Sequence, residues 1–221
     1  NLKEMVLTDI CPFTLGVGVH NPTDEDNLLM SPIIERNSAL PTSKVENYYT
    51  VSNGQDRLRI QVYQGDAMYC RDNLKLGELD LPVPPAPAGK EGAAVRFTYD
   101  INGILEVEAK SLSTQKTIST VLVGRGSGMT EAEAKKRLAQ LQGLKIHPRD
   151  QEENRLVLAR AERLWEEALG ETRDVIAQAA QAFGEALRSQ EPARILRGRK
   201  RCQGLLARVE AVLRRRGEDA Q

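Results

Sequence analysis

The residues best suited to chemistry are few and widely separated along the chain. Cys11, Cys70 and Cys202 are too far apart for a redox Cys-x-x-Cys pair or a zinc-ligand spacing. The two histidines, His20 and His147, do not belong to a recognised metal-ligand motif. We therefore expect ordinary thiols in a reducing, cytoplasmic compartment and no bound metal.

A glycine-rich stretch raises the possibility of phosphate binding. Residues 124–128 read Gly-Arg-Gly-Ser-Gly and lack the lysine of a G-x-x-x-x-G-K-[ST] loop. No nucleophile motif accompanies it. The stretch is better explained as a joint between two parts of the chain, and we expect no catalytic residue here.

Basic side chains gather near the C-terminus. Residues 188–216 hold ten Lys and Arg against Glu191 and Glu210, although the 221-residue chain has no net charge. Such a helical surface can bind phosphates by releasing counterions, which makes an RNA-binding module one hypothesis. Two alternatives are a solvated helix face and a protein-interaction bundle beside a purely structural sandwich.

Charge also differs between two halves. Residues 1–129 hold 12 basic and 16 acidic side chains, and residues 130–221 hold 19 and 15. The halves therefore carry about −4 and +4, which favours two modules.

The first half has the period of β-strands. Residues 57–63 alternate polar and apolar side chains, as in a strand with one buried face. Asn53-Gly54 and Asn102-Gly103 lie between such runs and predict type I′ hairpin turns. Residues 81–92 contain four prolines and predict a loop. About eight short strands without intervening helices predict an antiparallel β-sandwich.

The second half has the period of helices. Thr130 with Glu133 forms a capping-box pattern that predicts a helix to about Leu141. Pro148 and Pro192 suit the first turns of two further helices, and Gly170 is expected to end one of them. Apolar residues recur on one face of each segment, so a small antiparallel bundle is expected.

Several motifs in residues 5–130 resemble the substrate-binding region of DnaK-type heat-shock chaperones. They occur in the same order as in that family. They are residues 34–42 (IERNSALPT), 62–65 (VYQG), 73–77 (NLKLG), 85–89 (PAPAG), 97–100 (FTYD), 102–109 (NGILEVEA) and 127–130 (SGMT). Residues 145–149 (KIHPR) resemble the HscC branch of the family.

The resemblance implies three regions and a peptide channel. Residues 1–9 would be the remnant of an interdomain linker, residues 10–124 the peptide-binding sandwich, and residues 125–221 a helical lid. In the family an extended peptide crosses the sandwich and places one apolar side chain in a pocket. The residues implied for this site are Val17, Val19, His20, Tyr48, Tyr49, Val51, Leu58, Ile60 and Val95.

Some implied positions depart from the family pattern. His20 and Val51 stand where a Met and an Ala usually arch over the peptide, so we expect altered substrate preference. Asn53 and Ala88 replace a charged pair that reaches the lid. Tyr49 replaces a small polar residue and is expected either to narrow the channel or to stack on the peptide.

The resemblance also implies partners and a second domain. Met5, Val6, Leu7 and Asp9 match the allosteric linker, with Thr8 in place of a usual Leu. ATP and Mg²⁺ would bind in an N-terminal ATPase domain outside this chain. Unfolded polypeptide segments and a J-domain co-chaperone would be partners. We expect no membrane partner, and we favour polypeptide over nucleic acid as the ligand. Self-association through the channel or the lid is a further expectation.

Overall fold

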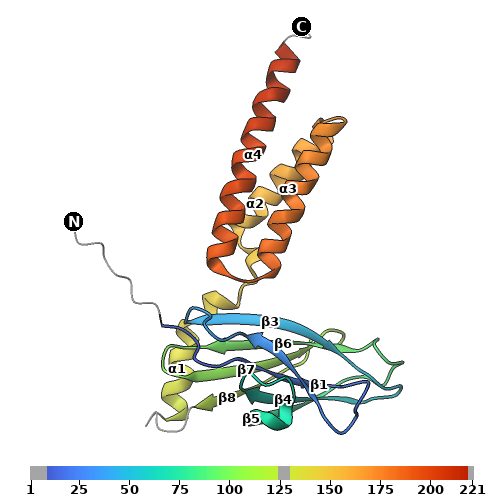
Figure 1. Cartoon of the computed structure of the whole chain (residues 1–221), viewed down its shortest axis with the longest axis vertical. Coiled ribbons are helices and arrows are strands. Elements are labelled where there is room, and N and C mark those ends of the chain that lie inside the picture. The colour runs from blue at the N-terminus through green and yellow to red at the C-terminus, as the bar shows by residue number, and fades with distance from the viewer. Residues whose placement is uncertain (1–8, 124–129, 219–221) are drawn as a thin grey trace, which may run out of the picture. The chain divides into compact units, whose positions relative to one another are not determined.

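A computed structural model describes residues 9–123 and 130–218 of the chain. The chain divides into two compact units, Asn1–Lys145 and Ile146–Gln221, each with its own buried core. The first unit contains the strands and a short helix, and the second contains three longer helices (Figure 1). The predicted fold class, an antiparallel β-sandwich followed by helices, is confirmed.

The first unit is built from two antiparallel four-stranded sheets. Their orders are β2-β1-β4-β5 and β3-β6-β7-β8. A 3-10 helix, η1 (Cys70–Asp72), precedes β5. The strands are β1 (Leu15–Val19), β2 (Leu29–Ile34), β3 (Thr42–Tyr49), β4 (Arg57–Gln64), β5 (Leu74–Pro82), β6 (Gly92–Tyr99), β7 (Ile104–Ser111) and β8 (Thr117–Val123).

Alternation of side chains explains the core between the sheets. On β4, Leu58, Ile60 and Val62 are buried and share one face. On β6, Ala93, Val95 and Phe97 do the same. The core is mostly aliphatic, so its stability depends on the area of apolar surface removed from water.

The two Asn-Gly turns have different roles. Gly103 has a φ of 78° and lies in the hairpin that joins β6 to β7, as predicted. Asn102 does not have a positive φ, so the turn is not the predicted type I′. Gly54 also has a positive φ, 72°, but β3 and β4 lie in different sheets. The predicted hairpin at Asn53-Gly54 is therefore wrong, because this turn carries the chain from one sheet to the other. The predicted proline loop is also shorter than expected, since β5 continues to Pro82.

A short helix belongs to the sandwich unit. Helix α1 (Glu131–Gln140) begins at the predicted capping box, in which the Thr130 hydroxyl accepts from the Glu133 amide. Ala134 and Leu138 of α1 pack on Ile104 of β7. A 3-10 helix, η2 (Gln142–Lys145), follows α1.

Lys145 fastens the end of this segment to β7. Its Nζ atom lies 2.5 Å from Glu106 Oε2 and 2.8 Å from Glu108 Oε2, and its side chain is 14% exposed. Burial alone lowers the pKa of Lys145, but the two carboxylates outweigh burial and the net pKa is raised. The α1–η2 segment is therefore held on the sandwich by apolar packing at one end and by charge at the other.

The second unit is a bundle of three helices. After the 3-10 helix η3 (Pro148–Asp150) come α2 (Glu152–Glu167), α3 (Glu171–Arg188) and α4 (Pro192–Glu218). Helix α2 ends before Gly170, which instead precedes α3 with a φ of 55°. Phe183, Leu164 and Leu206 are central to the bundle core. No helix in the described ranges is both long and apolar enough to cross a membrane.

Candidate functional site

The sandwich opens where β1 and β4 separate. These strands pair only from Leu15 to Val17 on β1, with Val17 opposite Val62. Beyond that point β1 continues alongside β2, and β4 runs back alongside β5. Val19 and Ile60 therefore do not pair with each other, and their side chains border the gap between β1 and β4.

This gap forms a cavity of about 640 Å³ between the two sheets. Its floor is apolar, with Val17, Leu58 and Ile60 buried there. Strand β3, which contributes Tyr48 and Tyr49, pairs only with β6 and is an edge of its sheet. The full lining is Val17, Gly18, Val19, His20, Pro22, Leu28, Asn47, Tyr48, Tyr49, Val51, Gln55, Leu58, Arg59, Ile60, Gln61 and Ala93.

Polar side chains hold the loop between β3 and β4 at one rim of the cavity. Gln55 Oε1 accepts from the Val51 amide at 3.0 Å, and Gln55 Nε2 donates to the Arg57 carbonyl at 2.7 Å. Asn53 Oδ1 accepts from the Ala88 amide at 2.9 Å. Asn53 and Ala88 stand at the positions that carry charges in the resembled family. Here they are joined by an uncharged hydrogen bond between two loops of the sandwich unit.

The opposite rim is the loop between β1 and β2. Buried Asn21 accepts from both the amide and the hydroxyl of Thr23, at 3.1 and 2.8 Å. Asn27 donates to Asp24 at 2.6 Å and accepts from Arg71 at 2.7 Å. Both rims are therefore positioned by hydrogen bonds before any ligand arrives, which lowers the entropic cost of binding.

Tyr48 spans the two sheets beside the cavity. Its hydroxyl lies 2.9 Å from the Ser31 hydroxyl of β2. Burial raises the pKa of Tyr48 to about 12, so the phenol stays protonated at neutral pH. The cavity wall at this point is a neutral aromatic ring with a satisfied polar end.

Eight of the nine residues implied for the channel line this one cavity. Val95 does not, because it lies two residues farther along β6, where it pairs with Glu46 and packs in the core. The residue opposite Tyr48 on β6 is Ala93, and it lines the cavity instead. Alternation along β6 contained this signal, since residues 93 and 95 share a face. The other lining residues missed from sequence are Gly18, Pro22, Leu28, Asn47, Gln55, Arg59 and Gln61.

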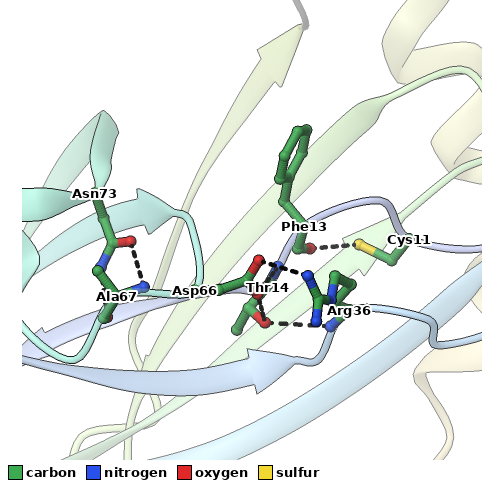
Figure 2. Close-up of polar contacts among 7 residues, drawn as sticks. All are labelled: Cys11, Phe13, Thr14, Arg36, Asp66, Ala67 and Asn73. Carbon is green, nitrogen blue, oxygen red and sulfur yellow. Dashed lines mark hydrogen bonds and ion pairs between the residues drawn. The ribbon is translucent and has the colours of Figure 1, made fainter.

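A polar cluster fixes the start of β1. The Thr14 hydroxyl donates to Asp66 Oδ1 at 2.7 Å and accepts from the Arg36 amide at 3.2 Å (Figure 2). The Thr14 hydrogen bonds lower the pKa of Asp66, and the charge of Arg36 adds to them. Asp9 lies just upstream, where its carbonyl accepts from the Leu40 amide at 2.8 Å. Met5, Val6 and Leu7 lie outside the described residues.

Replacing Asp66 with Asn is expected to lower stability at neutral pH and to flatten its acid dependence. A carboxylate whose folded pKa is lowered stabilises the fold above its unfolded pKa, about 3.9, and loses that effect as pH falls through the folded value. Urea unfolding at pH 7 and pH 3 measures this difference. Asp56→Asn is the control, because the exposed Asp56 carboxylate pairs with its neighbour Arg57. Equal acid dependence in wild type and Asp66→Asn would contradict this role.

The remaining reactive groups offer little chemistry. Cys11, Cys70 and Cys202 are free and buried, and burial raises the pKa of each thiol. Thiols with raised pKa values are poor nucleophiles at neutral pH. Within residues 9–123 and 130–218, no group of three His, Cys, Asp or Glu side chains gathers to hold a metal.

Comparison with known proteins identifies the family. The Hsp70 protein family matches residues 1–200, and the chain belongs to that family. It is 40% identical over 124 residues to "Chaperone protein DnaK" of Thermosipho africanus and of Thermotoga maritima. It is 34% identical over 144 residues to a ribosome-associated molecular chaperone of Eremothecium gossypii.

These matches cover 56% of this chain for the two DnaK proteins and 65% for the ribosome-associated chaperone. They cover only 20% and 22% of those relatives' own lengths, so the chain spans about a fifth of them.

Proposed function

We propose that this chain is the substrate-binding part of a DnaK-type chaperone, and that its cavity receives an apolar side chain from an extended polypeptide. The observation that carries the proposal is the apolar cavity where β1 and β4 separate, beside the edge strand β3. A sheet edge can hold a peptide backbone by hydrogen bonds, while a pocket selects a side chain. Non-native proteins are ligands of this kind because they expose extended apolar segments.

The cavity cannot supply the whole affinity. Burial of one Leu-sized side chain contributes about 1.5–3 kcal/mol, whereas a micromolar dissociation constant requires about 8 kcal/mol. Hydrogen bonds to the peptide backbone and contacts at both rims must provide the remainder.

The rim residues His20 and Val51 are exposed, and they are the proposed arch over the bound peptide. Peptide selectivity should therefore change in a His20→Met variant measured on one peptide panel.

The helical region is proposed to slow peptide release. The functional division remains a linker at 1–9, a sandwich at 10–124 and a lid at 125–221, although α1 packs on the sandwich. A chain that ends at Lys145 keeps α1 and the ion pairs of Lys145 with Glu106 and Glu108, and it lacks the whole three-helix bundle.

Ending the chain at Lys145 is expected to speed peptide dissociation by about tenfold or more without abolishing binding, since affinity differences are mostly differences in off-rate. Stopped-flow fluorescence of a labelled apolar peptide measures the rate. A chain ending at Met129 is the comparison, because it also uncovers Ile104 and should lose stability. Unchanged dissociation, or loss of all binding by the chain ending at Lys145, would refute a role of the bundle in release.

Further parts of the proposal concern the whole protein. ATP and Mg²⁺ would bind an ATPase domain outside this chain, and the linker around Met5–Asp9 would couple nucleotide state to peptide affinity. A J-domain co-chaperone, a cytoplasmic location, the HscC branch and self-association through channel or lid belong to the same proposal.

A peptide panel tested against the 221-residue chain is the direct test of the proposed peptide binding. Failure to prefer apolar over charged peptides would refute it.

A further inference from the structure

A second apolar groove lies on the helical bundle, between α3 and α4. These helices run side by side in opposite directions (Figure 1). Two cavities, of about 670 and 440 Å³, share Val175 and Leu205 and so form one continuous groove. We call this the α3–α4 groove. Along α4 it extends from Arg194 to Val212, about 27 Å at 1.5 Å per residue.

The floor of the groove is apolar and partly exposed. Val175 and Val212 are 43% and 47% exposed, and half-buried Leu205 lines both cavities together with Val175. The α3 side is built largely from small residues, Ala179, Ala182 and Ala186. Small side chains let another backbone approach closely, so this surface suits a helix better than a bulky loop.

The α4 wall of the groove is basic. Its arginines are all exposed, and none forms an ion pair within the part of the chain that the structure describes. Other arginines of the bundle do have partners, as Arg160 pairs with Glu210 and Arg199 with Glu153. Glu171, at one end, is the only acidic residue lining the described groove. The wall arginines are Arg194, Arg197, Arg201 and Arg208.

We propose that the α3–α4 groove binds an amphipathic helix of a partner protein, with acidic side chains along one flank of its apolar stripe. Helix-in-groove recognition needs an apolar floor of several turns, which the groove provides. Basic charge is present on the α4 wall only, so the acidic flank of the partner must face α4. RNA fits less well, because the one aromatic residue in the lining, Phe183, is buried and offers no stacking surface.

The probe is a labelled helical peptide of about five turns, with leucines at helical spacing and glutamates on one flank. Fluorescence anisotropy with the 221-residue chain should show binding that weakens by about tenfold or more when lysines replace the glutamates. Arg197→Glu with Arg201→Glu should weaken binding by a similar factor. Lys200→Glu is the matched control, because Lys200 is exposed on the same helix but does not line the groove.

Two further variants separate this site from others. Val175→Asp should weaken binding, since it places a charge on the floor at a position exposed enough to keep the fold. Leu58→Asp should leave binding unchanged, which distinguishes the groove from the sandwich cavity. The proposal is overturned by no binding, by equal loss in Lys200→Glu, by RNA binding more tightly to the same arginines, or by a groove-dependent dimer in sedimentation.

Discussion

Leu58→Asp is expected to reduce the affinity for extended apolar peptides by about a hundredfold or more. Leu58 is 7% exposed and forms part of the cavity floor, so a carboxylate there removes apolar contact and must be desolvated when a peptide binds. Loss of the burial of the peptide's apolar side chain alone corresponds to about 1.5–3 kcal/mol, or roughly ten- to a hundredfold in affinity. Desolvation of the new charge adds to that loss. Anisotropy of a labelled apolar peptide measures the change.

A buried carboxylate can also destabilise the sandwich, so a second substitution is needed. Val51 lines the same cavity and is 57% exposed, so Val51→Asp should fold normally and bind about tenfold more weakly. Leu74→Asp is the matched control, because Leu74 is 61% exposed on β5 and lies outside the cavity. Wild-type affinity in folded Leu58→Asp and Val51→Asp would exclude this cavity as the peptide site.

Phe97→Ala and Phe183→Ala are each expected to cost about 3–5 kcal/mol, but in different units. Phe97 is 0% exposed in the sandwich core, and Phe183 is 1% exposed in the bundle core. Each truncation leaves a cavity in one core only. The chain therefore should not lose stability uniformly, because separate cores can open separately.

The chain contains natural probes for each unit. Its single tryptophan, Trp165, lies in α2, whereas all five tyrosines lie in the sandwich unit. Phe183→Ala should shift the unfolding midpoint seen by Trp165 fluorescence and leave the tyrosine near-UV signal almost unchanged. Phe97→Ala should do the reverse. Equal shifts of both signals in either variant would show that the two cores unfold as one.

Local patterns in the sequence were sufficient for the helices and most of the strands, whereas family motifs pointed to half of the residues that line the cavity. Alternation at residues 57–63 marked β4, and Thr130 with Glu133 marked the start of α1. These signals are local because side-chain period and helix capping depend on residues a few positions apart. The cavity residues came from family motifs, and Leu58, Ile60 and Val19 do meet in space.

Pairing across long sequence distances was decided by the tertiary structure. The left-handed turn at Gly54 is a local property, but the partners of β3 and β4 depend on which faces pack against the other sheet. The register of β3 on β6 set Ala93, and not Val95, opposite Tyr48. The sequence likewise showed a basic run in residues 188–216, but only helix packing placed four of its arginines along an apolar groove.

The sequence by itself determined that β1 and β4 each carry one apolar face, because alternation requires only neighbouring residues. Tertiary structure alone decided that β1 and β4 separate after Val17 and Val62, and that α1 rests on β7. Both results depend on contacts between residues far apart in the chain, whose free energies no local period encodes.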